Sequence, residues 1–242
     1  MKVFNYNGKM EFQTLNDSEI RANYQHKYVV DKYLPYIKGR KVLDAGCWTG
    51  TMAKQISISG IDTDYTGIDV NDGALGLASR AFPKFSFVRG VLDDPSDGFI
   101  QSHKSSFDTV IFLDVIEHVK KGSETLVFRS LNSLLKPGGY LILSTMLSHP
   151  LNFIDPAWFF GHRHYPLVRV TRMIDEGGFE PIETSMLGNI YWDLDLLLLY
   201  IYKHVFRRQY KTPLALYNLM LKGLKSPQRW PTRIYVLVKK RE

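Results

Sequence analysis

Residues 42–50 constrain the fold of this chain more than any other segment. Their sequence, VLDAGCWTG, is a short apolar run that ends in Asp44 and is followed by Gly46 and Gly50, with a helical pattern after them. This order is typical of a buried strand, a tight turn and the beginning of a helix. Glycine lets the main chain approach a ligand closely, and the free N–H groups of a first helical turn point toward whatever binds there. The segment therefore predicts a ligand site at the turn.

A second acidic residue indicates the kind of ligand. Residues 65–69 form another short apolar run that ends in Asp69, whose carboxylate can accept hydrogen bonds from both hydroxyls of a ribose. Neither the phosphate-binding pattern G-x-x-x-x-G-K-S/T nor the dinucleotide pattern G-x-G-x-x-G occurs at the turn. The two segments together predict a nucleoside-like cofactor.

Three later segments extend this pattern, and with them the chain resembles the class I S-adenosylmethionine-dependent methyltransferases. The segments are residues 107–119 (FDTVIFLDVIEHV), 134–144 (LLKPGGYLILS) and 173–180 (MIDEGGFE), and the resemblance covers roughly residues 40–187. The chain is similar to the small-molecule members, which include quinone and lipid O-methyltransferases. The resemblance implies that S-adenosyl-L-methionine is the cofactor and that its methyl group goes to a small or lipid-like acceptor, at oxygen.

The resemblance also implies which residues contact the cofactor. Asp44, Gly46 and Gly50 would line its methionine moiety. Asp69 would hold the ribose, and Val70 would contact the adenine. The complete implied set is Asp44, Gly46, Cys47, Gly50, Asp69, Val70, Leu92, Asp93 and Asp114.

The chain departs from the family pattern at two places. Trp48 occupies the position of the family's central glycine, where a bulky side chain must point away from the cofactor or cap it. The acid after the third strand normally follows a glycine directly, but here Val91 stands in that place and Asp93 comes two residues later. Leu92 would offer its backbone N–H to the adenine. Cys47 has no neighbour that would stabilise a thiolate, so we interpret it as a small buried residue rather than a nucleophile.

Strand and helix patterns alternate along the chain, which predicts an α/β fold with a mostly parallel, doubly wound sheet and helices on both faces. The resemblance implies a Rossmann-like sheet of seven strands. We expect one overall domain with three parts: an N-terminal hairpin and covering helix (1–39), a core (40–187 and 229–242) and a helical insertion before the last strand (188–228). Asp44, Asp69, Asp93 and Asp114 end four strands and should surround one crevice.

Individual elements follow from periodicity and from turn residues. The Asn-Gly pair within residues 3–12 predicts a small hairpin. The remaining patterns predict helices over 19–37, 51–59 and 72–82, a strand over 85–89, two apolar stretches over 191–206 and 214–224 in the insertion, and a final strand over 232–239.

Composition limits the class of protein. A chain of 242 residues with 45% hydrophobic content can bury one substantial core. A single cysteine excludes an internal disulfide framework and a multi-cysteine zinc site. The start of the chain lacks a signal-peptide pattern, and the longest apolar run, residues 196–202, is far shorter than the roughly 20 residues that span a bilayer. We expect a cytoplasmic protein, either free or held at a membrane surface, and leave its oligomeric state open.

Histidines are the candidate catalytic residues, because a hydroxyl acceptor needs a base within hydrogen-bond reach. His118 follows the strand that ends at Asp114, and His162 and His164 lie in an aromatic loop over residues 158–165. The alternative is that these histidines are ordinary loop residues with local hydrogen bonds.

Asp114, Glu117 and His118 allow two interpretations. Similar residues in quinone O-methyltransferases and small-RNA 2′-O-methyltransferases hold a divalent ion together with a further histidine. In many other relatives they only cap a helix and close the floor of the pocket. We predict no metal at this site.

The insertion, residues 190–228, combines leucine- and tyrosine-rich stretches with basic residues. It is either a lid, a helical pair packed on the core, or a peripheral contact with an anionic membrane. The formal net charge of +7 does not predict a nucleic-acid partner, because no nucleic-acid module accompanies it. The predicted function is methyl transfer to a small or lipid-like acceptor. The alternatives are a metal-assisted RNA 2′-O-methyltransferase and a non-catalytic cofactor-binding scaffold.

Overall fold

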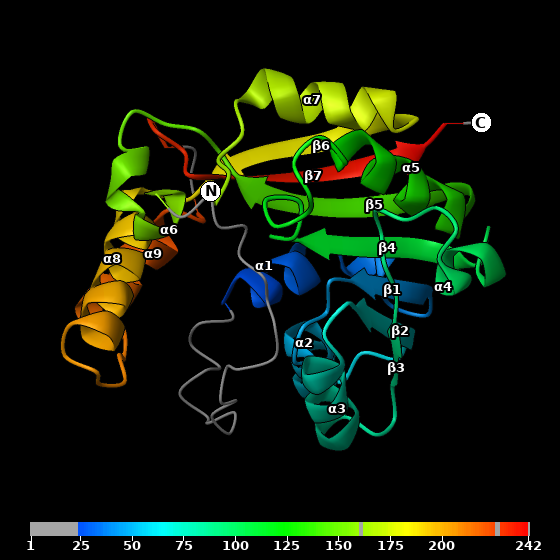
Figure 1. Ribbon diagram of the computed structural model, residues 1–242, viewed down its shortest axis with the longest axis horizontal. Helices are drawn as coiled ribbons and strands as arrows, with labels where there is room; N and C mark the ends of the chain where they lie inside the picture. Colours follow the sequence, from blue (N-terminus) through cyan, green and yellow to red (C-terminus); the bar gives the residue numbers. More distant parts are fainter. Residues whose placement is uncertain (1–23, 160–161, 226–227, 242) are drawn as a thin grey trace.

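A seven-stranded sheet with helices on both faces forms the centre of the molecule in the computed structural model, which describes residues 24–159, 162–225 and 228–241 (Figure 1). The spatial order of the strands is β3-β2-β1-β4-β5-β7-β6, and β7 alone runs antiparallel to its neighbours β5 and β6. The strands are β1 (Lys41–Ala45), β2 (Asp64–Asp69), β3 (Ser86–Arg89), β4 (Phe107–Leu113), β5 (Leu135–Met146), β6 (Phe179–Leu187) and β7 (Arg233–Lys240). The expected mostly parallel, doubly wound fold is confirmed.

Two apolar clusters cover the two faces of the sheet, because successive side chains of a strand point to opposite sides. Val42 and Ile111 pack with α1 and α2 on one face, whereas their neighbours Leu43 and Val110 pack with α4, α5 and α7 on the other. The helices are α1 (Tyr24–Lys32), α2 (Thr51–Ile58), α3 (Asp72–Ala81), α4 (Gly98–Ser102), α5 (Glu124–Leu134), α6 (Pro156–Phe159), α7 (Leu167–Glu176), α8 (Ile190–His204) and α9 (Leu214–Lys222), with 3-10 turns η2 (Leu34–Tyr36) and η3 (Asn152–Ile154). Such double-sided burial accounts for the apolar runs VIFL in β4 and YLIL in β5.

Strand β1 is the point at which the winding of the sheet reverses. It pairs in parallel with β2 on one side and with β4 on the other, and the chain crosses from the β3 edge to β4 between these two pairings. In open α/β sheets, ligands bind outside the carboxyl ends of the strands at such a switch point. The topology therefore directs attention to the residues that follow β1, β2 and β4.

The covering helix differs from its predicted bounds. Helix α1 ends at Lys32 rather than at residue 37, and the 3-10 turn η2 follows it. Pro35 explains this early end, because proline has no N–H to donate to the Asp31 carbonyl one turn earlier, and its ring would clash with that carbonyl in a continued α-helix. The predicted hairpin over residues 3–12 and the start of the covering helix lie outside the described residues.

The chain between β6 and β7 forms a helical hairpin of α8 and α9. Trp192, Leu216 and Met220 make a small apolar core between the two helices, and the Trp192 indole N–H donates to the Met220 carbonyl (3.3 Å). Figure 1 shows this hairpin on the side toward which the arrows of β4 and β5 point. Among the described residues, no helix is both long and apolar enough to cross a bilayer.

Candidate functional site

The turn after β1 is built on glycine. Gly46 (φ 85°) and Gly50 (φ 83°) both adopt the left-handed conformation, which glycine takes at no steric cost. A Cβ on Gly46 would lie 2.4 Å from Cγ2 of Val115, so this position has no room for a side chain. The amides of Gly46 and Cys47 donate to the Ile68 carbonyl and tie the turn to the end of β2 (2.8 and 2.9 Å). The turn thus brings the main chain close to the carboxyl ends of both strands.

Asp69 ends β2 in a fixed orientation beside this turn. Its Oδ2 accepts from the Trp48 amide (3.0 Å), and its Oδ1 accepts from the Asn71 amide (2.9 Å). The carboxylate is half-buried, and the next residue, Val70, is 57% exposed. Each carboxylate oxygen can accept a further hydrogen bond, so Asp69 can hold a diol on its open side. Trp48 itself has φ 48°, which is the conformation that the glycine of the family pattern would adopt without strain.

Asp44 and Cys47 lie beneath the turn rather than on its open side. Asp44 is buried, and its Oδ2 accepts from the Tyr65 hydroxyl (2.5 Å). Burial raises the pKa of Asp44 to about 7, and the nearby Asp69 carboxylate adds to this rise. The Cys47 thiol is also buried, which raises its pKa far above the ordinary value. An unreactive thiol agrees with the interpretation of Cys47 as a packing residue.

The other two acids that were expected at strand ends lie after their strands, Asp93 four residues beyond β3 and Asp114 directly after β4, and both have partners within the protein. Asp93 is half-buried and accepts from the Ser123 hydroxyl (3.3 Å). Asp114 (φ 54°) accepts from the Ser144 hydroxyl (3.0 Å) and forms an ion pair with Arg233. Although burial acts in the opposite direction, the Arg233 guanidinium holds the pKa of Asp114 below its usual value. Asp114 is therefore a charged residue that is already neutralised.

Glu117, His118 and His162 meet next to this ion pair. Glu117 is buried and accepts from the Thr145 hydroxyl at Oε2 (3.0 Å), whereas its Oε1 has no hydrogen-bond partner among the described residues. The Nε2 atom of His162 lies 3.9 Å from that Oε1, and the rings of His118 and His162 are 4.8 Å apart. Burial, with the like charge of Asp114, raises the pKa of Glu117 to about 7. Desolvation and the like charge of the neighbouring His162 lower the pKa of His118 to about 4.

A buried carboxylate, Asp155, orients two of the candidate histidines. Its Oδ2 accepts from Nδ1 of His162 (3.2 Å) and from Nε2 of His164 (2.9 Å). The His164 side chain is fully buried and also contacts Oδ1 of Asn152 (3.0 Å), whereas that of His162 is 15% exposed. The structure therefore favours His162 over His164 as a group that can reach an acceptor.

The segment that leads to the loop with His162 and His164 contacts the helical hairpin. Nε2 of His149, in the segment between β5 and η3 that leads to this loop, lies 2.9 Å from Oδ2 of Asp193 on α8, and both side chains are almost completely buried. The Arg163 guanidinium holds the opposite side of the loop by an ion pair with Glu124 (2.9 Å). The position of His162 is thus set from two sides.

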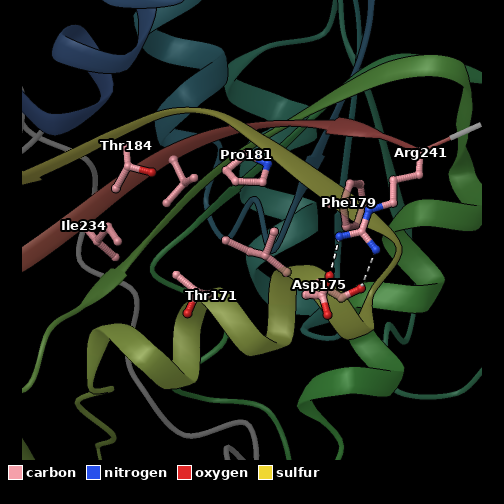
Figure 2. A pocket seen from close by; sticks show the side chains of 9 residues that line it. Thr171, Asp175, Phe179, Pro181, Thr184, Ile234 and Arg241 are labelled. Carbon is pink, nitrogen blue, oxygen red and sulfur yellow. Dashed lines mark hydrogen bonds and ion pairs between the residues drawn. The ribbon is translucent and has the colours of Figure 1, made fainter.

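A separate cavity lies away from the strand ends. Figure 2 shows that it opens between α7 and the strands β6 and β7, and its volume is about 270 Å³. Ile174, Phe179 and Val236 give it an apolar lining, and the pair of Arg241 with Asp175 stands at its rim. None of the predicted site residues lines this cavity.

Comparison with known families agrees with this geometry. The family described as "Methyltransferase domain" matches residues 21–184, which is more than half of the chain and includes strands β1 to β5 and the first part of β6. The chain belongs to this methyltransferase family. The resemblance to class I S-adenosylmethionine-dependent enzymes is thereby confirmed.

Curated methyltransferase relatives match over the same part of the chain. A ubiquinone biosynthesis O-methyltransferase of Shewanella pealeana is 28% identical over 139 residues, which cover 57% of this chain and 55% of that protein. One of Marinobacter nauticus is 29% identical over 151 residues, covering 60% and 58%. The chain thus spans little more than half the length of these relatives.

Solved structures share the fold at low identity. The cyclase SpnF has a TM-score of 0.65 at 16% identity and covers 91% of this chain and 82% of its own. A SAM-dependent methyltransferase of Archaeoglobus fulgidus has a TM-score of 0.59 at 17% identity, covering 90% and 94%. Because one of the two is a cyclase, the fold alone does not prove methyl transfer.

Three residues of the candidate site were not predicted. Asp155 had a signal in the sequence, since it is an acid that precedes a pair of histidines in one loop. Arg233 had none, because it reaches Asp114 only through the antiparallel β7, whose first residue lies where the parallel strands end. Tyr65 had none either, because the apolar face of β2 gives no sign of its bond to Asp44.

Proposed function

We propose that this methyltransferase transfers the methyl group of S-adenosyl-L-methionine to a hydroxyl of a small, lipid-like acceptor. The observation that carries the proposal is the Asp69 carboxylate, which two backbone amides fix beside the glycine turn. Its oxygens can accept further hydrogen bonds on the exposed side. The names of the curated relatives support an oxygen acceptor on a quinone-like molecule. S-adenosylhomocysteine binding, measured by calorimetry, tests the cofactor assignment, and methyl transfer to catechols with long alkyl chains tests the acceptor class.

Methyl transfer requires the protein mainly to align the acceptor with the cofactor. The sulfonium of the cofactor supplies an electrophilic methyl group, so the acceptor oxygen forms the new C–O bond as the C–S bond breaks. The protein must align oxygen, methyl carbon and sulfur, exclude water and take the hydroxyl proton. In this proposal Asp69 and the amides of the glycine turn orient the cofactor, and a histidine takes the proton.

His162 is the proposed base. Because its Nδ1–H donates to the buried Asp155, the lone pair of a neutral imidazole is on Nε2, which faces Glu117 and His118. Asp155 is the positioning residue, and His164 contacts the same carboxylate oxygen. Nε2 of His162 is then free to accept the proton that the acceptor loses.

We expect Asp155→Asn to lower kcat by about tenfold to a hundredfold, because the imidazolium formed during transfer loses its carboxylate partner. The acid limb of the pH profile of kcat should also move to lower pH, an effect that a merely structural residue would not produce. Asp108→Asn is the matched control, since Asp108 is a half-buried acid at the amino end of the central strand β4, whereas the candidate site lies beyond the carboxyl ends of the strands. An unshifted profile in Asp155→Asn would contradict the positioning role.

A second candidate function is metal-assisted methylation of an RNA 2′-hydroxyl. The observation that favours it is the unpartnered, buried Oε1 of Glu117, whose cluster with His118 and His162 has ligand atoms within 4.8 Å of one another. Carboxylate and neutral imidazole groups are ligands that suit a divalent ion, so these three residues fit such an ion. Asp114 does not join them, because it forms an ion pair with Arg233. A bound ion would lower the pKa of an acceptor hydroxyl.

We expect a divalent ion, if Glu117 holds it, to bind about tenfold more tightly for each pH unit gained up to about 7, and no more tightly above. The pKa of Glu117 is raised to about 7, so below that pH the ion must displace a proton. Titration with Co²⁺, followed by its visible absorption, measures this, and Glu117→Gln should abolish it while the exposed Glu180→Gln should not. Full activity after treatment with EDTA would instead favour His162 as a base.

A further inference from the structure

The loop that joins α8 to α9 carries exposed apolar side chains at the far end of the helical hairpin. We define this tip as residues 202–214. Val205 is 69% exposed, Phe206 57% and Leu214 59%. Figure 1 shows the tip (orange, lower left) well away from the sheet. The apolar core of the hairpin is supplied by other residues, so these three side chains are not used for packing there.

The same tip is strongly cationic. Lys203, Arg207, Arg208 and Lys211 are exposed, and within the described part of the chain no carboxylate forms an ion pair with them. From residue 196 to residue 241 the sequence contains no Asp or Glu and 11 Lys or Arg, which exceeds the net charge of +7 of the whole chain. The excess positive charge of the protein therefore lies in this region.

Hydrogen bonds within the hairpin fix the shape of the tip. Asp195 on α8 accepts from the Tyr210 hydroxyl (2.7 Å) at Oδ1 and from the Thr212 hydroxyl (3.1 Å) at Oδ2. The nearest acid in the sequence is thus turned inward and does not offset the cations. The tip is held in a shape that presents apolar and cationic groups together.

We propose that the tip docks the protein on an anionic lipid bilayer. Val205, Phe206 and Leu214 enter the boundary between headgroups and acyl chains, and the four cations contact lipid phosphates. Nucleic acid would also attract these cations, but it offers no apolar phase for exposed valine and leucine side chains. The proposal builds on the proposed function, because a lipid-like acceptor would partition into that bilayer.

Flotation of the full chain with vesicles tests this. We expect binding to vesicles of phosphatidylglycerol and phosphatidylcholine, weak binding to phosphatidylcholine alone, and a loss of binding as salt is raised. Val205→Ser with Phe206→Ser should weaken binding at least about tenfold. Neutralising all four cations to Gln should weaken it by about fivefold for each charge removed.

The matched control removes four exposed cations from the core, with the substitutions Arg80→Gln, Lys104→Gln, Lys121→Gln and Arg129→Gln. It should retain vesicle binding. Vesicle binding unchanged by both tip variants, or no binding by the native chain, would overturn the proposal. Binding of RNA in place of vesicles, with the same dependence on the four cations, would also overturn it and identify the tip as a nucleic-acid contact. The affinity of the same variants for S-adenosylhomocysteine should not change. Because this affinity tests the proposed function, its measurement distinguishes a failure of membrane docking from a failure of the proposed function.

Discussion

We expect Asp69→Ala to weaken S-adenosylhomocysteine binding by about a hundredfold, or about 2.7 kcal/mol. Asp69 is fixed by the amides of Trp48 and Asn71, so in the proposed function its carboxylate would meet the ribose hydroxyls without reorganising. A hydrogen bond to a charged acceptor contributes about 1.5–3 kcal/mol, so the expected loss corresponds to at least one such bond to the ribose. Isothermal titration calorimetry on the purified chain measures the loss.

Asp72→Ala is the control for this change. Asp72 lies three residues later, its side chain is 80% exposed, and its removal alters the charge equally without touching the turn. The affinity of Asp72→Ala for S-adenosylhomocysteine should stay within a factor of about two of the native value, since exposed charges interact weakly. Native affinity in Asp69→Ala, with Asp72→Ala also unchanged, would refute the ribose assignment.

The second large effect should come from His162→Ala, which we expect to lower kcat at least about a hundredfold while KM changes little. Removing a positioned base costs this much when the acceptor must lose a proton in the transition state. A steady-state assay with a catechol acceptor gives both constants. His164→Ala should lower kcat less, because that side chain is fully buried and can act only through Asp155.

His103→Ala provides the matched control. His103 stacks on Phe99 after α4, away from the candidate site, with ring centroids 4.2 Å apart. Its removal should leave kcat unchanged. If His162→Ala were as active as His103→Ala, the acceptor would have to ionise by itself or at another group, and the assignment of His162 as the base would be wrong.

The fold could be predicted because its signals are local. The segment around Asp44, Gly46 and Gly50 indicated a strand, a turn and a helix, and each is present at those residues. Strand–helix alternation then leaves few topologies open, since parallel connections are right-handed. The predicted end of the covering helix was wrong. The helical spacing of aliphatic residues continues beyond Pro35, but the local effect of this proline is stronger than that of the periodicity.

The candidate site was less predictable because it depends on contacts between distant segments. The sequence identified His162 but not the carboxylate that orients it, since neither the burial of Asp155 nor its contact with His162 can be read from the sequence. Asp114 was predicted to contact the cofactor, whereas its strongest partner is Arg233, which is 119 residues away in the chain. Whether Asp114 also touches the cofactor stays a prediction.

The buried contact of His149 with Asp193 has a consequence for engineering this enzyme. In the proposed function the segment that carries His162 forms the acceptor wall, and this contact anchors that segment to α8, so remodelling the helix should also displace the wall. A library aimed at new acceptors therefore has reason to vary α8 together with residues 149–164, and swapping the hairpin between homologues should carry substrate preference with it.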